Sequence, residues 1–138
     1  MKVLVVDDDV SVRESVSKVL REEGYEAVLA ADGNTALKQF DDHKIDLLLL
    51  DLGLPIKNGW DVFEQITTEN PLVPVIIITG QADQYRMAVA AGVGALMEKQ
   101  LDALQLLHTI RDLLVEPKEV RLHRLDRKST RLNSSHRL

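Results

Sequence analysis

Two short apolar runs of this chain each end in carboxylates. Lys2–Val6 leads into the three aspartates at 7–9, and Leu47–Leu50 leads into Asp51. Runs of Val and Leu of this length are typical of strands buried on both faces of a parallel sheet. The C-terminal ends of parallel neighbours lie at one edge of the sheet, where open α/β folds bind ligands. Carboxylates gathered there repel one another unless a cation lies among them, so the pattern predicts a metal site around one aspartate.

Two further polar residues, one of them beside a glycine, follow later strand-like runs. Thr79 and Gly80 come at the end of one run, and Lys99 lies just beyond another. Together with the aspartates they offer hard oxygen ligands, a hydroxyl and a mobile cation around one point. Mg²⁺ prefers a few carboxylates together with waters and phosphate oxygens, and a lysine and a hydroxyl neutralise and orient phosphoryl oxygens. This set suits phosphoryl transfer to or from Asp51.

Strand-like and helix-like segments alternate along the chain. The expected strands are Lys2–Val6, Glu26–Leu29, Asp46–Leu50, Val73–Ile78 and Ala95–Met97. Between and after them lie five helical patterns, which are residues 10–23, residues 33–40 after an Asp32 cap, residues 60–69, a segment that follows Gly80 and extends to about Ala91, and residues 104–114 before Pro117. This alternation predicts an α/β fold with a doubly wound, five-stranded parallel sheet and helices on both faces. Right-handed crossovers with one reversal of winding give the flavodoxin-like order 2-1-3-4-5.

Composition limits the function classes. With 138 residues and no cysteine, one domain without disulfides or thiolate metal sites is expected. No apolar run approaches 18 residues, so a soluble protein of the cytoplasm with no membrane contact is expected. Residues 1–116 carry 10 Lys and Arg against 20 Asp and Glu, a net charge of −10, and residues 117–138 carry 7 against 2, a net charge of +5. Direct nucleic-acid binding by the acidic part is therefore not expected.

The site residues resemble those of a known family. The motifs that carry the resemblance are Val5-Val-Asp-Asp8, Asp51-Leu-Gly-Leu-Pro55 with Asn58-Gly59, Ile78-Thr-Gly80 and Glu98-Lys99. In this order and spacing they resemble a CheY-like receiver domain of a two-component response regulator, over about residues 1–116. The resemblance implies that Asp51 accepts a phosphoryl group from a sensor histidine kinase or a phosphotransfer protein. It implies a phosphoacceptor with at most slow self-catalysed phosphorylation and dephosphorylation, not an enzyme.

The resemblance also assigns a role to each site residue. Asp8, Asp51 and the Gly53 carbonyl would ligate Mg²⁺, and Asp7 would act mainly through a bound water. Thr79 would bond the phosphoryl oxygen, and Lys99 would pair first with Asp51 and then with the phosphoryl group. The switched surface would be the face of the fourth and fifth strands, through which a homodimer is a further expectation. Asp9 is expected to cap the first helix.

Three positions depart from the family pattern. Gln100 stands where proline usually follows the lysine, so a trans peptide bond is expected there. Leu96 stands where an aromatic residue often moves with the threonine, and Asn58 replaces the usual aspartate before Gly59. Leu96 and Gln100 keep open the alternative of a phosphorylation-independent pseudo-receiver that binds other proteins.

A second alternative is a haloacid-dehalogenase-like phosphohydrolase. Asp7 and Asp9 have the Asp-x-Asp spacing of that family. However, Val10-Ser11 follows at the positions where that family has Gly-Thr, and the sequence has no segment for a cap domain. Multiple turnover of a phosphatase substrate would favour this alternative.

The basic segment 117–138 is a separate part of the chain. It has no periodic apolar face and few aromatic residues, so it is expected to be disordered. The run from about Asp126 to His136 resembles a translated sequencing adapter, which would make it non-native and would mean that any effector domain after about Leu122 is replaced. A basic arm for nucleic acid is the rival interpretation.

Overall fold

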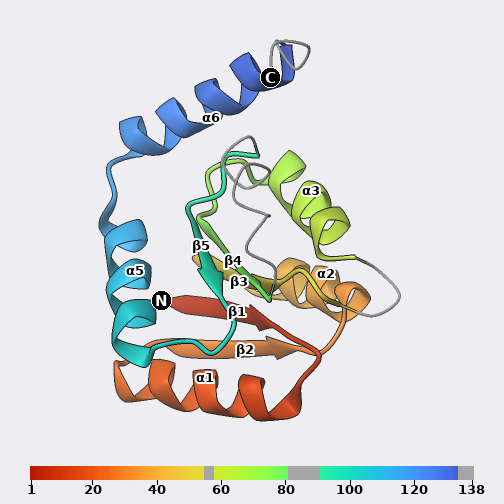
Figure 1. The fold of residues 1–138 in the computed structure, drawn as a ribbon, viewed down its shortest axis with the longest axis vertical. Coiled ribbons are helices and arrows are strands. Elements are labelled where there is room, and N and C mark those ends of the chain that lie inside the picture. The colour runs from red at the N-terminus through yellow and green to blue at the C-terminus, as the bar shows by residue number, and fades with distance from the viewer. Residues whose placement is uncertain (55–57, 81–90, 134–138) are drawn as a thin grey trace.

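The structure, a computed structural model, describes residues 1–54, 58–80 and 91–133. Its strands are β1 (Lys2–Val6), β2 (Glu26–Ala30), β3 (Leu47–Asp51), β4 (Val75–Thr79) and β5 (Ala95–Glu98). Its helices are α1 (Val10–Glu22), α2 (Gly33–Asp42), α3 (Gly59–Glu69), α5 (Ala103–Val115) and α6 (Lys118–Asn133) (Figure 1). The helix expected between Gly80 and about Ala91 falls on residues 81–90, which lie outside the described residues. The loop residue Pro55 also lies outside them.

The five strands form one parallel sheet in the order β2-β1-β3-β4-β5, which confirms the predicted topology. The winding reverses between β1 and β3, so a crevice forms at their carboxyl ends. The register aligns these ends closely, because Val6 pairs with Leu50, Asp51 with Ile78 and Thr79 with Glu98. The residues that follow the strands are thereby brought to one edge.

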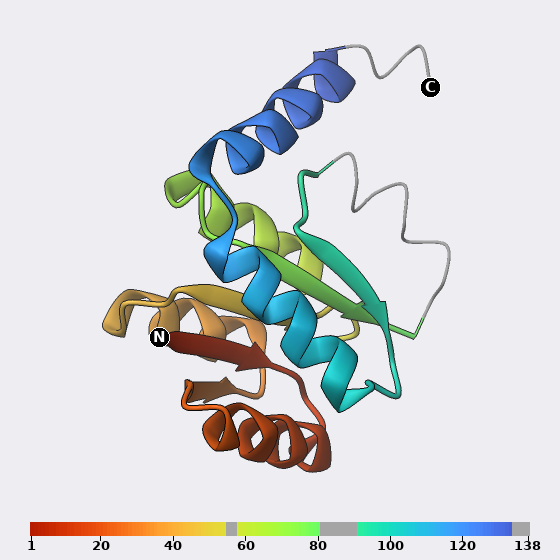
Figure 2. The same ribbon diagram turned by 90° about the vertical axis from the view of Figure 1, so that its left-hand side faces the viewer.

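Alternation along the strands divides the core into two clusters. One side chain of each successive pair faces α1 and α5, and the other faces α2 and α3. Both sets are apolar, which explains why the strands read as continuous Val, Leu and Ile runs. Figure 2 shows α5 lying across one face of the sheet. The first cluster contains Val3, Val5, Leu47, Leu49, Ile76 and Ile78 with Val16, Leu20, Leu106 and Ile110. The second contains Leu4, Val6, Leu48, Leu50 and Ile77 with Ala36, Val62, Phe63 and Ile66.

Local signals place the helix ends as the sequence predicted. Asp9 caps α1 by accepting a hydrogen bond from the Ser11 N–H, and Asp32 caps α2 through the Thr35 N–H. After α1, Gly24 adopts a φ of +87°, the left-handed conformation in which glycine commonly ends helices.

The tail departs from the expected disorder. Residues 118–133 form α6, whose first turns are tied back to the end of α5. The Arg121 guanidinium donates to the Leu113 carbonyl at 2.6 Å, and Arg124 donates to the Glu116 carboxylate at 2.6 Å. These contacts join residues before and after Pro117, and the segment is rich in Lys, Arg, Glu and Leu, which favour helix. In Figures 1 and 2, α6 extends away from the layers of the sheet.

None of the helices within the described ranges combines the length and the apolar character needed to cross a bilayer.

Candidate functional site at the carboxyl edge of the sheet

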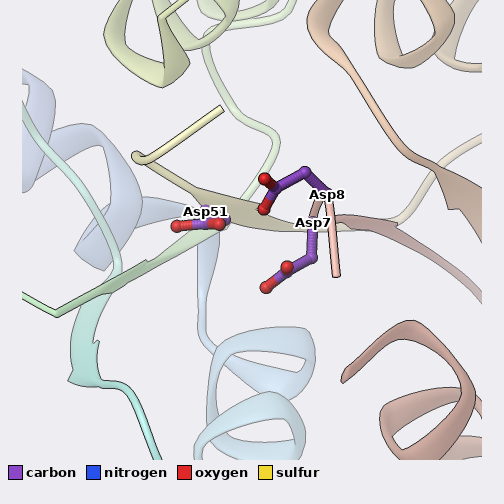
Figure 3. Close-up of side chains that lie close together, drawn as sticks. All are labelled: Asp7, Asp8 and Asp51. Carbon is purple, nitrogen blue, oxygen red and sulfur yellow. The ribbon is translucent and has the colours of Figure 1, made fainter. Parts of the chain in front are cut away.

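Three aspartates converge where β1 and β3 end. Asp7 and Asp8 follow β1, Asp51 is the last residue of β3, and Figure 3 shows the three side chains close together. One carboxylate oxygen from each lies within 4.8 Å of the other two. Asp7 and Asp51 are buried, with 0% and 1% of their surface exposed, whereas Asp8 is exposed. The cluster therefore has a closed inner side and one carboxylate open to solvent.

Asp7 is a buried carboxylate that the protein satisfies only in part. Its Oδ1 accepts from the Asp9 N–H at 2.9 Å, while its Oδ2 has no hydrogen-bond partner among the described residues. Burial raises the pKa of Asp7, the Asp9 N–H opposes that shift, and the neighbouring Asp51 and Asp8 charges add to it. Lys99 also opposes the shift but leaves the pKa raised. The site thus disfavours a charge on Asp7 unless another cation is bound.

The Asp51 carboxylate accepts hydrogen bonds from two donors. Its Oδ1 accepts from the Gly53 N–H at 3.0 Å, and its Oδ2 accepts from the Lys99 ammonium at 3.1 Å. The Lys99 side chain is 41% exposed, so it reaches the buried carboxylate from the solvent side. Burial alone would lower the pKa of Lys99, but the hydrogen bond to Asp51 and the charges of the aspartates raise it. Lys99 is therefore a fully protonated partner.

Thr79 is the last residue of β4 and lines a cleft together with Asp51 and Lys99. It is 3% exposed, and its carbonyl accepts from the Lys99 N–H at 2.8 Å, which ties the lysine loop to the strand. A cleft of about 420 Å³ opens in front of these residues. Its lining includes Asp51, Leu52, Gly53, Asn58, Trp60, Thr79, Gly80 and Lys99. A phosphoryl-sized group on Asp51 would enter this cleft.

The start of α3 supports the end of β3 in a way that the sequence did not reveal. Asn58 caps the helix by accepting from the Trp60 N–H at 2.7 Å, as its turn-forming character suggested. A Cβ on Gly59 would lie 2.6 Å from the Asp51 carbonyl oxygen and 2.7 Å from the Leu52 Cα. Only glycine permits this approach of helix to strand. The Asn-Gly pair signalled a turn, but the close contact depends on a non-local fit.

Arg13 is a second residue whose contribution the sequence did not indicate. It lies in α1, and its guanidinium donates to the Asp7 carbonyl at 2.7 Å. This bond holds the backbone that carries both Asp7 and Asp8. A basic residue one turn after the Asp9 cap was the available signal, but such a residue usually faces solvent.

The residues fit a divalent cation. Carboxylate oxygens are the ligands that Mg²⁺ prefers, and Mg²⁺ usually retains several waters. The cluster provides carboxylates from Asp7, Asp8 and Asp51, one of them exposed, and the buried Asp7 Oδ2 has no described partner. A cation among these groups would relieve their mutual repulsion. The donor set thus matches the metal predicted from the sequence.

Most of the predicted site residues come together. Asp9 lies apart from them in function, as expected. Asp51, Thr79 and Lys99 meet at one cleft, with Asp7 and Asp8 beside them. Asp9 instead uses its side chain to cap α1, the role that was expected for it.

The departures from the family pattern leave the lysine contact in place. Leu96 packs, partly buried, against the α2/α3 cluster. The Lys99–Gln100 peptide is trans, as predicted, and Lys99 nevertheless reaches Asp51.

Comparison with known proteins points to one family. The model of the response regulator receiver domain family matches residues 3–111. The sensory transduction protein RegX3 of Mycobacterium tuberculosis is 37% identical over 114 residues, which cover 81% of this chain and 50% of RegX3. The chain spans about half the length of the curated relatives it matches.

Solved structures agree with this match. A CheY-like response regulator receiver domain protein from Methanospirillum hungatei aligns with a TM-score of 0.79 at 29% identity, covering 86% of this chain and 95% of its own. The response regulator TrrA of Thermotoga maritima, solved in complex with Mg(2+)-BeF, aligns with a TM-score of 0.74 at 29% identity, covering 81% and 97%.

Proposed function

The chain belongs to the response regulator receiver domain family of two-component signalling, and from this premise we propose that Asp51 is the residue that accepts the phosphoryl group. The observation that carries the proposal is the setting of the Asp51 carboxylate. It is buried at a strand end, faces a cleft, and is held by the Gly53 N–H and the Lys99 ammonium. A nucleophile so fixed needs little reorganisation when the reaction begins.

The reaction is a displacement at phosphorus. A carboxylate oxygen of Asp51 attacks the phosphorus of a phosphohistidine, an oxygen–phosphorus bond forms, and the nitrogen–phosphorus bond breaks. The imidazole nitrogen leaves with the electron pair and takes up a proton. Charge develops on the phosphoryl oxygens. The Lys99 ammonium would leave the Asp51 oxygen and pair with one of them.

The aspartates would hold Mg²⁺ during this reaction. Asp8, Asp51 and the Gly53 carbonyl are the proposed ligands, with Asp7 acting through a water. When bound, the ion neutralises charge shared between the carboxylates and the phosphoryl oxygens. TrrA, which is similar over most of this chain, was solved with Mg(2+)-BeF, and this supports the assignment. Thr79 lines the same cleft, where its hydroxyl would meet a phosphoryl oxygen.

The family also indicates the partner. A sensor histidine kinase or a phosphotransfer protein is the proposed donor, and the proposed compartment is the cytoplasm. The proposed module is a phosphoacceptor with at most slow self-catalysed reactions. A homodimer through the face of β4 and β5 remains a prediction.

A small-molecule phosphodonor tests the proposal without knowledge of the kinase. The protein is incubated with acetyl phosphate or phosphoramidate and Mg²⁺, and its intact mass is measured. One added phosphoryl group is expected for the wild type and for the exposed control Asp41→Asn, and none for Asp51→Asn or in excess EDTA. An absent adduct on the wild type, or an equal adduct on Asp51→Asn, contradicts the proposal.

A further inference from the structure

The loop between β5 and α5 carries the lysine of the site, and both of its ends are fixed. At the first end, the Lys99 N–H donates to the Thr79 carbonyl at 2.8 Å. At the other end, Asp102 caps α5 by accepting from the Leu104 and Gln105 N–H groups at 2.9 and 3.2 Å. Gln100 and the partly buried Leu101 are the two residues between these anchors.

Gln100 has an unusual backbone conformation. Its φ is +68°, and within the described ranges it is the one residue other than glycine with a positive φ. The left-handed region is unfavourable for residues that carry a Cβ, and it is worst for β-branched side chains. Such a conformation persists only where the surrounding structure imposes it. Here the two anchors do so.

The side chain of Gln100 does not account for its conformation. Gln100 is exposed, and its amide forms no hydrogen bond or ion pair within the part of the chain that the structure describes. The turn is therefore a property of the backbone. It lets Lys99 face the sheet edge while Leu101 packs against the cluster of α1 and α5. With an extended or helical residue at position 100, the chain would turn in another direction. The contact of Lys99 with Asp51 and the packing of Leu101 could then not both be kept.

We propose that Gln100 is a positioning residue whose left-handed turn holds the Lys99 ammonium against Asp51. The inference rests on the proposed function, because it assigns to Gln100 the placement of a group that acts on the phosphoryl oxygens. Lys99 is 41% exposed and bonds Asp51 at the end of a flexible stem. Without a fixed backbone at its base, its ammonium would spend much of its time in solvent.

Substitutions at Gln100 that differ in their tolerance of positive φ test this role. Glycine and asparagine adopt the left-handed conformation readily, whereas valine resists it. Because the side chain is exposed, none of these changes removes a buried contact. Gln100→Gly and Gln100→Asn should keep the wild-type rate of phosphorylation by phosphoramidate. Gln100→Val should lower that rate about fivefold. Gln100→Thr, also β-branched, supplies the comparison if Gln100→Val does not fold.

Magnesium affinity gives a second readout that a general loosening of the site would not reproduce. Trp60, the single tryptophan, lines the cleft, so its emission reports Mg²⁺ titrations. Lys99 competes with the cation for the Asp51 carboxylate. Displacing the lysine in Gln100→Val should therefore tighten Mg²⁺ binding about threefold. A merely disordered site would bind Mg²⁺ more weakly.

The same substitutions in a Lys99→Ala background complete the test. There the Gly and Val variants should agree within about twofold in both readouts, because the positioned group is gone. The positioning role is overturned if Gln100→Gly and Gln100→Val have the same phosphorylation rate and Mg²⁺ affinity while Lys99 is present. It is also overturned if the two variants differ as much in the Lys99→Ala background as they do with Lys99 present. If the wild type fails to take the phosphoryl group, the proposed function falls while the Mg²⁺ titrations still decide the role of Gln100. A wild type that neither takes up the phosphoryl group nor binds Mg²⁺ overturns both the proposed function and the positioning role of Gln100.

Discussion

Replacing Asp7 by asparagine should stabilise the metal-free protein. The two side chains have the same shape, and asparagine keeps the oxygen that accepts from the Asp9 N–H at 2.9 Å. What the substitution removes is a buried negative charge that lies within 4.8 Å of Asp51 and Asp8. The same substitution removes a group from the proposed cation site, so its effect should reverse when Mg²⁺ is present.

The magnitude follows from the separation of the charges. Two unit charges no more than 4.8 Å apart, at an effective dielectric constant of about 20, repel by at least roughly 3.5 kcal/mol. The Lys99 cation and the solvent around Asp8 offset part of this repulsion. A net gain of about 2 kcal/mol in the free energy of unfolding is expected, which corresponds to a rise in Tm of about 8 °C for a domain of this size.

Urea unfolding followed by circular dichroism measures this gain in EDTA and again in Mg²⁺. The wild type should be stabilised by Mg²⁺, because an ion that binds the folded state adds to its stability. Asp7→Asn should gain much less from the ion, and the exposed control Asp41→Asn should match the wild type in both conditions.

The pH dependence of the stability gain tests whether the buried charge of Asp7 is its cause. Burial raises the pKa of Asp7, so the folded protein holds this proton more tightly than the unfolded chain. The penalty for the charge is absent below the ordinary pKa of 3.8 and develops as the pH rises through the raised value. The advantage of Asp7→Asn should therefore shrink as the pH falls from about 7 to about 4. A variant no more stable than the wild type in EDTA at neutral pH would refute the reasoning.

Three other substitutions test contacts around the site. Gly59→Ala should lower the free energy of unfolding by about 2 to 3 kcal/mol, because the new Cβ would lie 2.6 Å from the Asp51 carbonyl oxygen; a loss below about 0.5 kcal/mol in urea unfolding would contradict this. Arg13→Ala removes the donor to the Asp7 carbonyl and should weaken Mg²⁺ binding about threefold in a calorimetric titration, an effect that an unchanged affinity would exclude. Arg121→Ala removes the 2.6 Å bond to the Leu113 carbonyl and should speed hydrogen exchange in the first turns of α6, whereas unchanged exchange would show that other contacts hold the helix.

The sheet could be predicted from the sequence because its strands are buried on both faces. Continuous runs such as Leu47–Leu50 are unambiguous once turn signals and amphipathic helices separate them. The site could be predicted for a related reason, since parallel strands in register bring the residues after them to one edge. Asp51, Thr79 and Lys99 lie far apart in the chain and meet for this reason alone.

The features that could not be predicted depend on contacts between distant segments. The fit of Gly59 against β3 and the bond from Arg13 to the Asp7 carbonyl are invisible to local pattern. Gln100 stood out as a departure from the family pattern, but its left-handed conformation follows from anchors on both sides. The helical tail likewise depends on arginines that reach back across Pro117 to Glu116.

Chemical mapping of the modified residue is the most direct test of the central claim. An acyl phosphate on aspartate is reduced by borohydride to homoserine, which marks the acceptor position permanently. After treatment with phosphoramidate and Mg²⁺, reduction and trypsin cleavage, the peptide from Ile45 to Lys57 contains two candidates, Asp46 and Asp51. Tandem mass spectrometry should find homoserine at position 51 and intact aspartate at position 46. Homoserine at another aspartate, with position 51 unmodified, would contradict the account.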